Sequence, residues 1–339
     1  MESVFLWLIA TDRSLKANSH GLKNCQQLSI MSIVIICHER FAKNWAKSFK
    51  EKLPETDVHI YPDVPSPEAI QFAAVWKAPA GVLSEFPNLK AVQSLGAGVE
   101  HIFDFQKINK QTPVARIIDP QLSEDMWEYI LMLVLNYLKN TPIYFQQQLK
   151  KEWKQWRYKT IKETTVSILG LGKIGGHVAG KFSQIGFNVQ GWSNSEKNIK
   201  GVKSFFGKNG FNEILNTTDI LINILPLTPD TTGILNKTNL SKLKKGAYLI
   251  NVGRGGHLID TDLLELIDAG HLSGAALDVF QEEPLPGNHP FWEHPKITVM
   301  PHVAGLTNPA TAVSQIIENY ERMKRGEELM NVVSRGKRY

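Results

Sequence analysis

The chain has 339 residues, of which 42% are hydrophobic, and a net charge of +5. This length and composition can bury a sizeable core and predict two globular domains. Lys and Arg are spread along the chain without an aromatic-interleaved patch, which argues against nucleic-acid binding and favours small anionic ligands. Only Cys25 and Cys37 are present, so we expect no disulfide framework and a cytoplasmic location.

Residues 1–30 differ from the rest of the chain. The apolar run at 4–10 is too short to span a bilayer, and Glu2 precedes it where a signal peptide would carry positive charge. We therefore expect no membrane association. The polar run that follows has no periodicity, so residues 1–30 are expected to be a disordered extension, with Met31 as the natural start of the protein.

Residues 33–118 alternate between apolar runs and helical segments, which predicts a parallel, flavodoxin-like sheet. A glycine loop at 95–102 follows one of its strands. Such a loop can present the backbone N–H groups of Ala97 and Gly98 to a small carboxylate. An ordinary tight turn between strand and helix explains the same residues equally well. The predicted strands are 33–37, 58–61, 73–76, 89–94 and 114–118.

Residues 123–138 predict a long helix with Ser123 as its cap and acidic residues in its first turn. The helix is apolar on most sides, which is typical of a core helix or of one buried between domains or subunits. Residues 150–162 are rich in Trp and Lys and predict an exposed arm or loop.

The stretch 165–193 has the order strand, glycine turn, helix and second strand that a dinucleotide-binding fold requires. Its turn reads G-L-G-K-I-G. Gly170 permits the tight turn, Gly172 lets backbone N–H groups approach a pyrophosphate, and Gly175 lets the helix lie close to the strand. A structural turn is the alternative, and the second strand argues against it. The predicted cofactor contacts are Gly170, Gly172, Lys173, Ile174 and Gly175.

The residues after the second strand predict the cofactor. An NAD site usually places an acid there for the ribose 2′-hydroxyl, but this chain reads S-N-S-E-K at 193–197. We therefore predict NADPH; Glu196, or a polar loop without selectivity, leaves NADH possible. The predicted donors to the 2′-phosphate are Ser193, Asn194, Ser195 and Lys197.

Further strands at 219–225, 247–252, 274–279 and 297–300 complete a doubly wound sheet, and 306–339 predicts a helix and a basic tail. A helix before the third of these strands is expected to stop at Gly270.

Three side chains directly follow predicted strands, where ligands of such sheets bind: Arg254, Glu283 and His302. This set suits reduction of a 2-keto acid. Arg would fix the carboxylate and polarise the carbonyl, His would donate a proton, and Glu would orient the His. Singly, each has a structural interpretation: a surface ion pair, a solvated loop acid, a core histidine. No metal-ligand cluster accompanies them.

At these residues the sequence resembles the D-isomer-specific 2-hydroxyacid dehydrogenases, from Met31 onward. The motifs are L-G-L-G-K-I-G (169–175), L-P-L-T-P-D (225–230), N-V-G-R-G (251–255), L-D-V-F-Q-E-E-P-L-P (277–286) and P-H (301–302). Within the family, L-G-A-G-V-E (95–100), V-W (75–76), G-W-S (191–193) and the final R-G-K-R-Y are most similar to the glyoxylate/hydroxypyruvate reductase A branch. This branch tends to carry a more basic stretch where Asn194 and Ser195 stand.

The resemblance implies reduction of glyoxylate and hydroxypyruvate to glycolate and glycerate by hydride from NADPH. It makes Arg254, Glu283 and His302 the catalytic residues, with His302 as proton donor. It also places the nicotinamide carboxamide at Asp278, the adenine at Pro226 and the substrate carboxylate at Ala97 and Gly98. Trp76 either forms a wall of the substrate pocket or is an ordinary core or surface residue.

The family is usually homodimeric, with the cofactor domain inserted into the substrate domain. This implies a substrate domain of residues 31–118 plus 306–339 and an NAD(P)-binding domain of residues 119–305. Two other functions stay open: a dehydrogenase of another 2-hydroxy acid, such as a phosphoglycerate-like one, and a non-enzymatic dinucleotide-sensing protein. The complete trio argues against the second.

Overall fold

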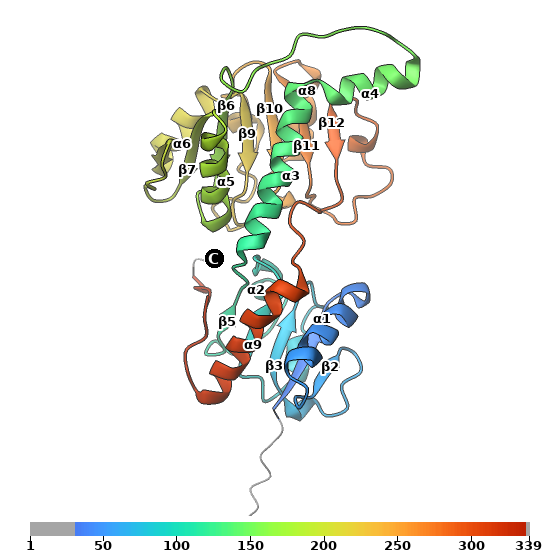
Figure 1. Ribbon diagram of the computed structural model, residues 1–339, viewed down its shortest axis with the longest axis vertical. Coiled ribbons are helices and arrows are strands. Elements are labelled where there is room, and N and C mark those ends of the chain that lie inside the picture. The colour runs from blue at the N-terminus through green and yellow to red at the C-terminus, as the bar shows by residue number, and fades with distance from the viewer. Residues whose placement is uncertain (1–30, 337–339) are drawn as a thin grey trace, which may run out of the picture. The chain divides into compact units, whose positions relative to one another are not determined.

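The computed structural model describes residues 31–336, which form two parallel β-sheets with helices between their strands (Figure 1). The expectations for residues 1–30 lie outside the described residues. The first sheet has the order β2-β1-β3-β4-β5, and the second has the order β12-β11-β10-β9-β6-β7-β8. These are the flavodoxin-like and the doubly wound dinucleotide-binding orders. The predicted α/β fold class is confirmed.

The first sheet is formed by early strands, but helices from both ends of the described chain cover it. On one face, Trp45 and Phe49 of α1 (Glu39–Lys52) pack with Ile316 and Tyr320 of α9 (Pro309–Arg325). The other face is covered by the 3₁₀ turn η2 (Val82–Glu85) and by α2 (Glu100–Phe103). The strands are β1 (Ser32–Ile36), β2 (Val58–Ile60), β3 (Ile70–Val75), β4 (Ala91–Ser94) and β5 (Val114–Ala115).

The basic segment after α9 is hydrogen-bonded to this sheet. Val332 forms an antiparallel bridge with Ala115, and Val333 N–H donates to the Val114 carbonyl at 2.8 Å. The segment therefore extends the first sheet beyond β5.

The second sheet is sandwiched between two groups of helices. One face packs on α3 (Pro120–Leu138) and α5 (Lys173–Gln184), and the other on α6 (Gly207–Asn216), α7 (Lys237–Leu240) and α8 (Asp260–Asp268). Helix α8 is followed by Gly270 at φ +69°, as predicted. The strands are β6 (Thr165–Leu169), β7 (Asn188–Ser193), β8 (Val202–Phe206), β9 (Ile220–Asn223), β10 (Ala247–Asn251), β11 (Leu272–Leu277) and β12 (Ile297–Val299).

Strand β8 was absent from the sequence prediction. It lies at the edge of the sheet, where Phe205 is its only buried residue, and its sequence V-K-S-F-F lacks the continuous apolar run of the inner strands.

The predicted start of α3 is wrong. The helix begins at Pro120, and the Asp119 carboxylate accepts from Gln121 N–H at 2.9 Å, so Asp119 and not Ser123 is the cap. Proline at the first helical position favours this start because it needs no hydrogen-bond acceptor there. The first turn therefore contains no acidic residue. The helix does bury an apolar face, with Trp127 edge-on to Phe182 of α5.

The predicted exposed arm is confirmed. Helix α4 (Thr141–Lys150) leads into residues 151–160, all of which are exposed and outside helices and strands. The side chains of Leu149 and Trp153 are 79% and 97% exposed. Between residues 31 and 336, no helix has the length and apolarity to cross a membrane.

Candidate active site

The glycine turn lies between β6 and α5, next to the position where the strand order of the second sheet reverses. Gly170 has φ +104°, and a Cβ atom on Gly175 would lie 1.8 Å from the Gly170 carbonyl oxygen. A Cβ on Gly172 would meet nothing within 4 Å, so the N-terminus of α5 is open. Lys173 is exposed there and Ile174 is partly buried. This geometry fits a dinucleotide pyrophosphate.

The S-N-S-E-K segment follows β7 beside this turn, because Gly170 N–H donates to the Trp192 carbonyl at 2.8 Å. Ser193 Oγ donates to the Ser195 carbonyl at 2.7 Å, and the side chains of Asn194, Ser195 and Lys197 are exposed. Pro226 is exposed beyond the neighbouring strand β9. The predicted cofactor residues thus come from adjacent strand ends.

Glu283 and His302 form a direct pair. His302 Nδ1 lies 2.8 Å from Glu283 Oε2, and Glu283 Oε1 accepts from Phe280 N–H at 3.1 Å. Burial opposes ionisation of Glu283, but hydrogen bonds from His302 and Lys77 outweigh it and lower its pKa to about 2. The carboxylate is therefore ionised at neutral pH and fixes Nδ1 as the protonated nitrogen, so Nε2 is the atom available for a reacting group.

Arg254 lies against the glycine loop after β4. Its Nε donates to Glu100 Oε1 at 2.6 Å and its Nη1 to the Gly253 carbonyl at 2.7 Å. Its Nη2 lies so close to Gly98 that a Cβ atom there would be only 2.0 Å away. The guanidinium is therefore held from two sides beside the loop predicted to receive a carboxylate.

The loop itself is shaped by Ser94, whose Oγ donates to the Gly98 carbonyl at 2.6 Å and accepts from Gly96 N–H at 3.2 Å. Within residues 31–336, the N–H groups of Ala97 and Gly98 have no protein acceptor. The Trp76 ring packs on Gly96 and lies edge-on to His101, with ring centroids 4.7 Å apart. Trp76 therefore covers this loop.

The loop carrying Arg254 and the loop carrying Glu283 are in backbone contact. A Cβ atom on Gly255 would lie 1.8 Å from the Phe280 carbonyl carbon, so only glycine permits this approach. This contact places the arginine loop beside the Glu283–His302 pair.

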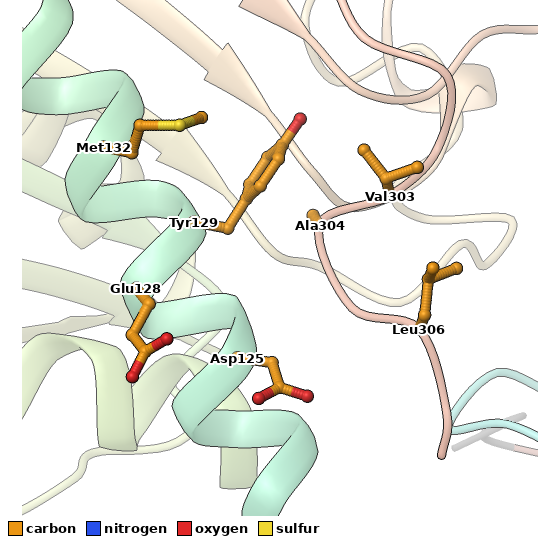
Figure 2. A pocket seen from close by; sticks show the side chains of 7 residues that line it. All are labelled: Asp125, Glu128, Tyr129, Met132, Val303, Ala304 and Leu306. Carbon is orange, nitrogen blue, oxygen red and sulfur yellow. The ribbon is translucent and has the colours of Figure 1, made fainter. Parts of the chain in front are cut away.

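Asp278 is buried and connects α3 to the segment after His302. Its Oδ1 accepts from Tyr129 OH at 2.8 Å and from Val303 N–H at 2.9 Å, and its Oδ2 accepts from Ala304 N–H at 2.9 Å. Figure 2 shows Tyr129 projecting from α3 toward Val303 and Ala304, which line one surface hollow of about 460 Å³. Asp278 and Tyr129 thus hold the backbone next to the histidine.

His257 was missed by the sequence analysis. It is fully buried, and its Nδ1 accepts from Arg254 N–H at 3.2 Å and Asn223 Nδ2 at 2.9 Å. Its Nε2 lies 3.2 Å from the Pro226 carbonyl. Burial lowers its pKa to about 4, so it is neutral, with Nδ1 as acceptor and Nε2–H as donor. It positions the backbones of Arg254 and Pro226.

An open dinucleotide turn beside an Arg, a Glu and a His at neighbouring strand ends defines a nicotinamide-dependent oxidoreductase. A family model for the D-isomer specific 2-hydroxyacid dehydrogenase NAD-binding domain matches residues 131–304. The chain belongs to the D-isomer specific 2-hydroxyacid dehydrogenase family.

Curated relatives match over most of the chain. It is 39% identical to glyoxylate/hydroxypyruvate reductase A of Yersinia enterocolitica, covering 88% of this chain and 97% of the relative. It is 40% identical, with the same coverage, to the Photorhabdus laumondii protein of that name.

Two solved structures are similar, each with a TM-score of 0.85. One is a D-isomer specific 2-hydroxyacid dehydrogenase from Xanthobacter autotrophicus Py2 in complex with NADPH and MES; it is 35% identical and covers 91% of this chain and 99% of its own. The other is an NADPH-dependent glyoxylate/hydroxypyruvate reductase from Sinorhizobium meliloti with NADP and sulfate; it is 33% identical and covers 91% and 100%.

Proposed function

We propose that the protein reduces glyoxylate and hydroxypyruvate to glycolate and glycerate, with NADPH as the hydride source. The observation that carries this proposal is the 2.8 Å pair between His302 and the ionised Glu283, on a loop in contact with that of Arg254. The similarity to glyoxylate/hydroxypyruvate reductases over 88% of the chain supports this choice of substrates.

When bound, NADPH supplies the hydride for the keto carbon. The Arg254 guanidinium binds the substrate carboxylate together with the N–H groups of Ala97 and Gly98. His302 holds a proton at Nε2 and donates it to the keto oxygen as that oxygen gains negative charge. Glu283 keeps the imidazole in its orientation and stabilises its protonated form through Nδ1. Trp76 forms a wall of the substrate pocket above the loop.

The cofactor preference follows from the segment after β7. Asn194, Ser195 and Lys197 place amide, hydroxyl and ammonium donors beside Glu196, and the first position after the strand lacks the acid of a usual NAD site. Ser193 would join these donors once its hydroxyl turns away from the Ser195 carbonyl. Similar structures contain NADPH or NADP, which supports the same preference. The N-terminus of α5 would bind the pyrophosphate, Pro226 would contact the adenine, and Asp278 would contact the carboxamide of the nicotinamide.

We further propose that residues 31–118 and 306–339 form the substrate domain and that residues 119–305 form the NAD(P)-binding domain. The two sheets support this division. Strands β1–β5 form one sheet, on which α9 packs, and strands β6–β12 form the other.

The protein is proposed to act as a homodimer in the cytoplasm. The exposed apolar residues Phe145 and Leu149 of α4 and Trp153 of the arm favour burial against a second copy. Sedimentation velocity should give the mass of a dimer, and a monomeric mass at micromolar concentration would count against it. The low cysteine content supports the compartment, which cell fractionation tests.

Purified protein is expected to oxidise NADPH when glyoxylate or hydroxypyruvate is added. Its kcat/KM for NADPH should be higher than its kcat/KM for NADH. The measurement is the fall in nicotinamide absorbance across a panel of 2-keto acids crossed with both cofactors. Preference for a phosphorylated or larger keto acid would replace the proposed substrates. Tight NADPH binding without turnover of any keto acid would instead indicate a binding protein.

A further inference from the structure

Lys77 contacts the same carboxylate oxygen as the histidine. It follows β3 of the first sheet, and its Nζ lies 2.8 Å from Glu283 Oε2, the atom that also pairs with His302 Nδ1. The Glu283 side chain is 19% exposed and the Lys77 side chain 52% exposed. One oxygen therefore accepts from two different donors, at the edge of the candidate active site.

Lys77 and His302, the two residues that contact this oxygen, both have a left-handed backbone conformation. Within residues 31–336, the non-glycine residues with positive φ are Lys77, Asn140, Lys151, His302 and Asn331. Lys77 has φ +47° and His302 has φ +54°, conformations that cost free energy for residues with a side chain. Such strain persists where the surrounding structure requires it, and it is concentrated at functional sites.

An exposed ion pair by itself contributes little to stability, because water screens the charges and both side chains lose conformational freedom. Stability is therefore a weak explanation for this contact. Its geometry has a more specific consequence, since Lys77 holds Oε2 of the Glu283 carboxylate while Phe280 N–H holds Oε1.

We propose that Lys77 is a positioning residue, which fixes the Glu283 carboxylate in the orientation and charge state that holds His302 ready to donate a proton. The proposal rests on the proposed function, because it assigns Lys77 a role in the same reaction. The titratable groups acting on Glu283 are His302 and Lys77, with Phe280 N–H as the backbone donor.

The test compares Lys77→Met with Lys77→Arg, using Lys237→Met as a matched control. Lys237 also pairs with a glutamate, Glu265, but both of those side chains are 59% exposed and lie on α7 and α8. Lys77→Met is expected to lower kcat roughly 10- to 100-fold, because a displaced acid group reacts poorly. KM and the melting temperature should stay close to the wild-type values. Lys77→Arg should restore most of kcat, and Lys237→Met should behave as wild type.

The pH profile gives a second readout. Lys77 helps to lower the pKa of Glu283, so its removal should raise that pKa and move the acid limb of kcat to higher pH. A rise in KM with kcat unchanged would overturn the proposal by making Lys77 a substrate-binding residue. An equal loss of activity and melting temperature in both Lys77 variants would overturn it by showing a structural role.

A measurement without turnover separates this proposal from the proposed function. The Glu283 carboxyl carbon can be titrated by ¹³C NMR in wild type and Lys77→Met, with Glu283→Gln for assignment. The midpoint is expected to be higher in Lys77→Met than in wild type, because one of the two side-chain donors that lower the pKa of Glu283 is lost. An unmoved midpoint overturns the role of Lys77 even when wild type is active. If the wild-type protein turns over no 2-keto acid, that result overturns only the proposed function.

Discussion

Replacing His302 with glutamine is expected to lower kcat for glyoxylate and hydroxypyruvate by roughly 10²- to 10⁴-fold, the usual contribution of a positioned general acid. Glutamine keeps a hydrogen-bonding group that can reach Glu283, but it cannot release a proton at neutral pH. NADPH binding should change little, because the predicted cofactor contacts lie at other strand ends. Steady-state kinetics and a fluorescence titration of NADPH measure the two quantities.

His294→Gln is the matched control for this substitution. His294 precedes β12 and pairs with Asp268, whereas His302 follows the same strand, so the two histidines lie at opposite ends of one element. The control should retain wild-type kcat and melting temperature. A His302→Gln protein with undiminished turnover would remove the proposed proton donor.

Arg254→Lys is expected to lower kcat/KM by about 10²- to 10³-fold, even though the positive charge is kept. The guanidinium donates through Nε to Glu100 and through Nη1 to Gly253, and its Nη2 lies beside Gly98. A lysine ammonium is a single donor group without this planar fork, so it cannot satisfy Glu100 and a substrate carboxylate in the same geometry. KM for the keto acid should rise and kcat should fall with it.

Arg322→Lys provides the comparison for Arg254. Arg322 pairs with Glu318 on the surface of α9 and should tolerate lysine without kinetic effect. If Arg254→Lys left KM and kcat at wild-type values, the substrate carboxylate would have to bind elsewhere.

Local sequence patterns predicted much of the fold and of the candidate active site. The inner strands are continuous apolar runs, and the glycine turn and its flanking strands have fixed spacing, so every strand except edge strand β8 was predicted near its observed position. Individual bounds differ, since β3 begins at Ile70 and not at residue 73, and β5 ends at Ala115 and not at residue 118. Arg254, Glu283 and His302 were found because each lies in the loop that follows a strand, namely β10, β11 and β12. Such positions can be read from the sequence once the strands are known.

The supporting residues could not be predicted in this way, because long-range packing decides their partners. Lys77 meets Glu283 across 206 residues, Glu100 meets Arg254 across 154, and Tyr129 meets Asp278 across 149. No periodicity or motif spacing encodes those pairs. The cap of α3 was misplaced for a different reason, since Ser123 and Asp119 are both acceptable cap residues and the Pro120 after Asp119 decides between them.

The central claim is that Arg254 and the Glu283–His302 pair act on one bound 2-hydroxy acid. A crystal structure of the protein with NADP⁺ and glycerate tests it most directly. We expect the glycerate carboxylate between the Arg254 guanidinium and the N–H groups of Ala97 and Gly98, with its 2-hydroxyl within hydrogen-bond distance of His302 Nε2. A glycerate bound with that hydroxyl remote from His302, or with its carboxylate away from Arg254, would contradict the account.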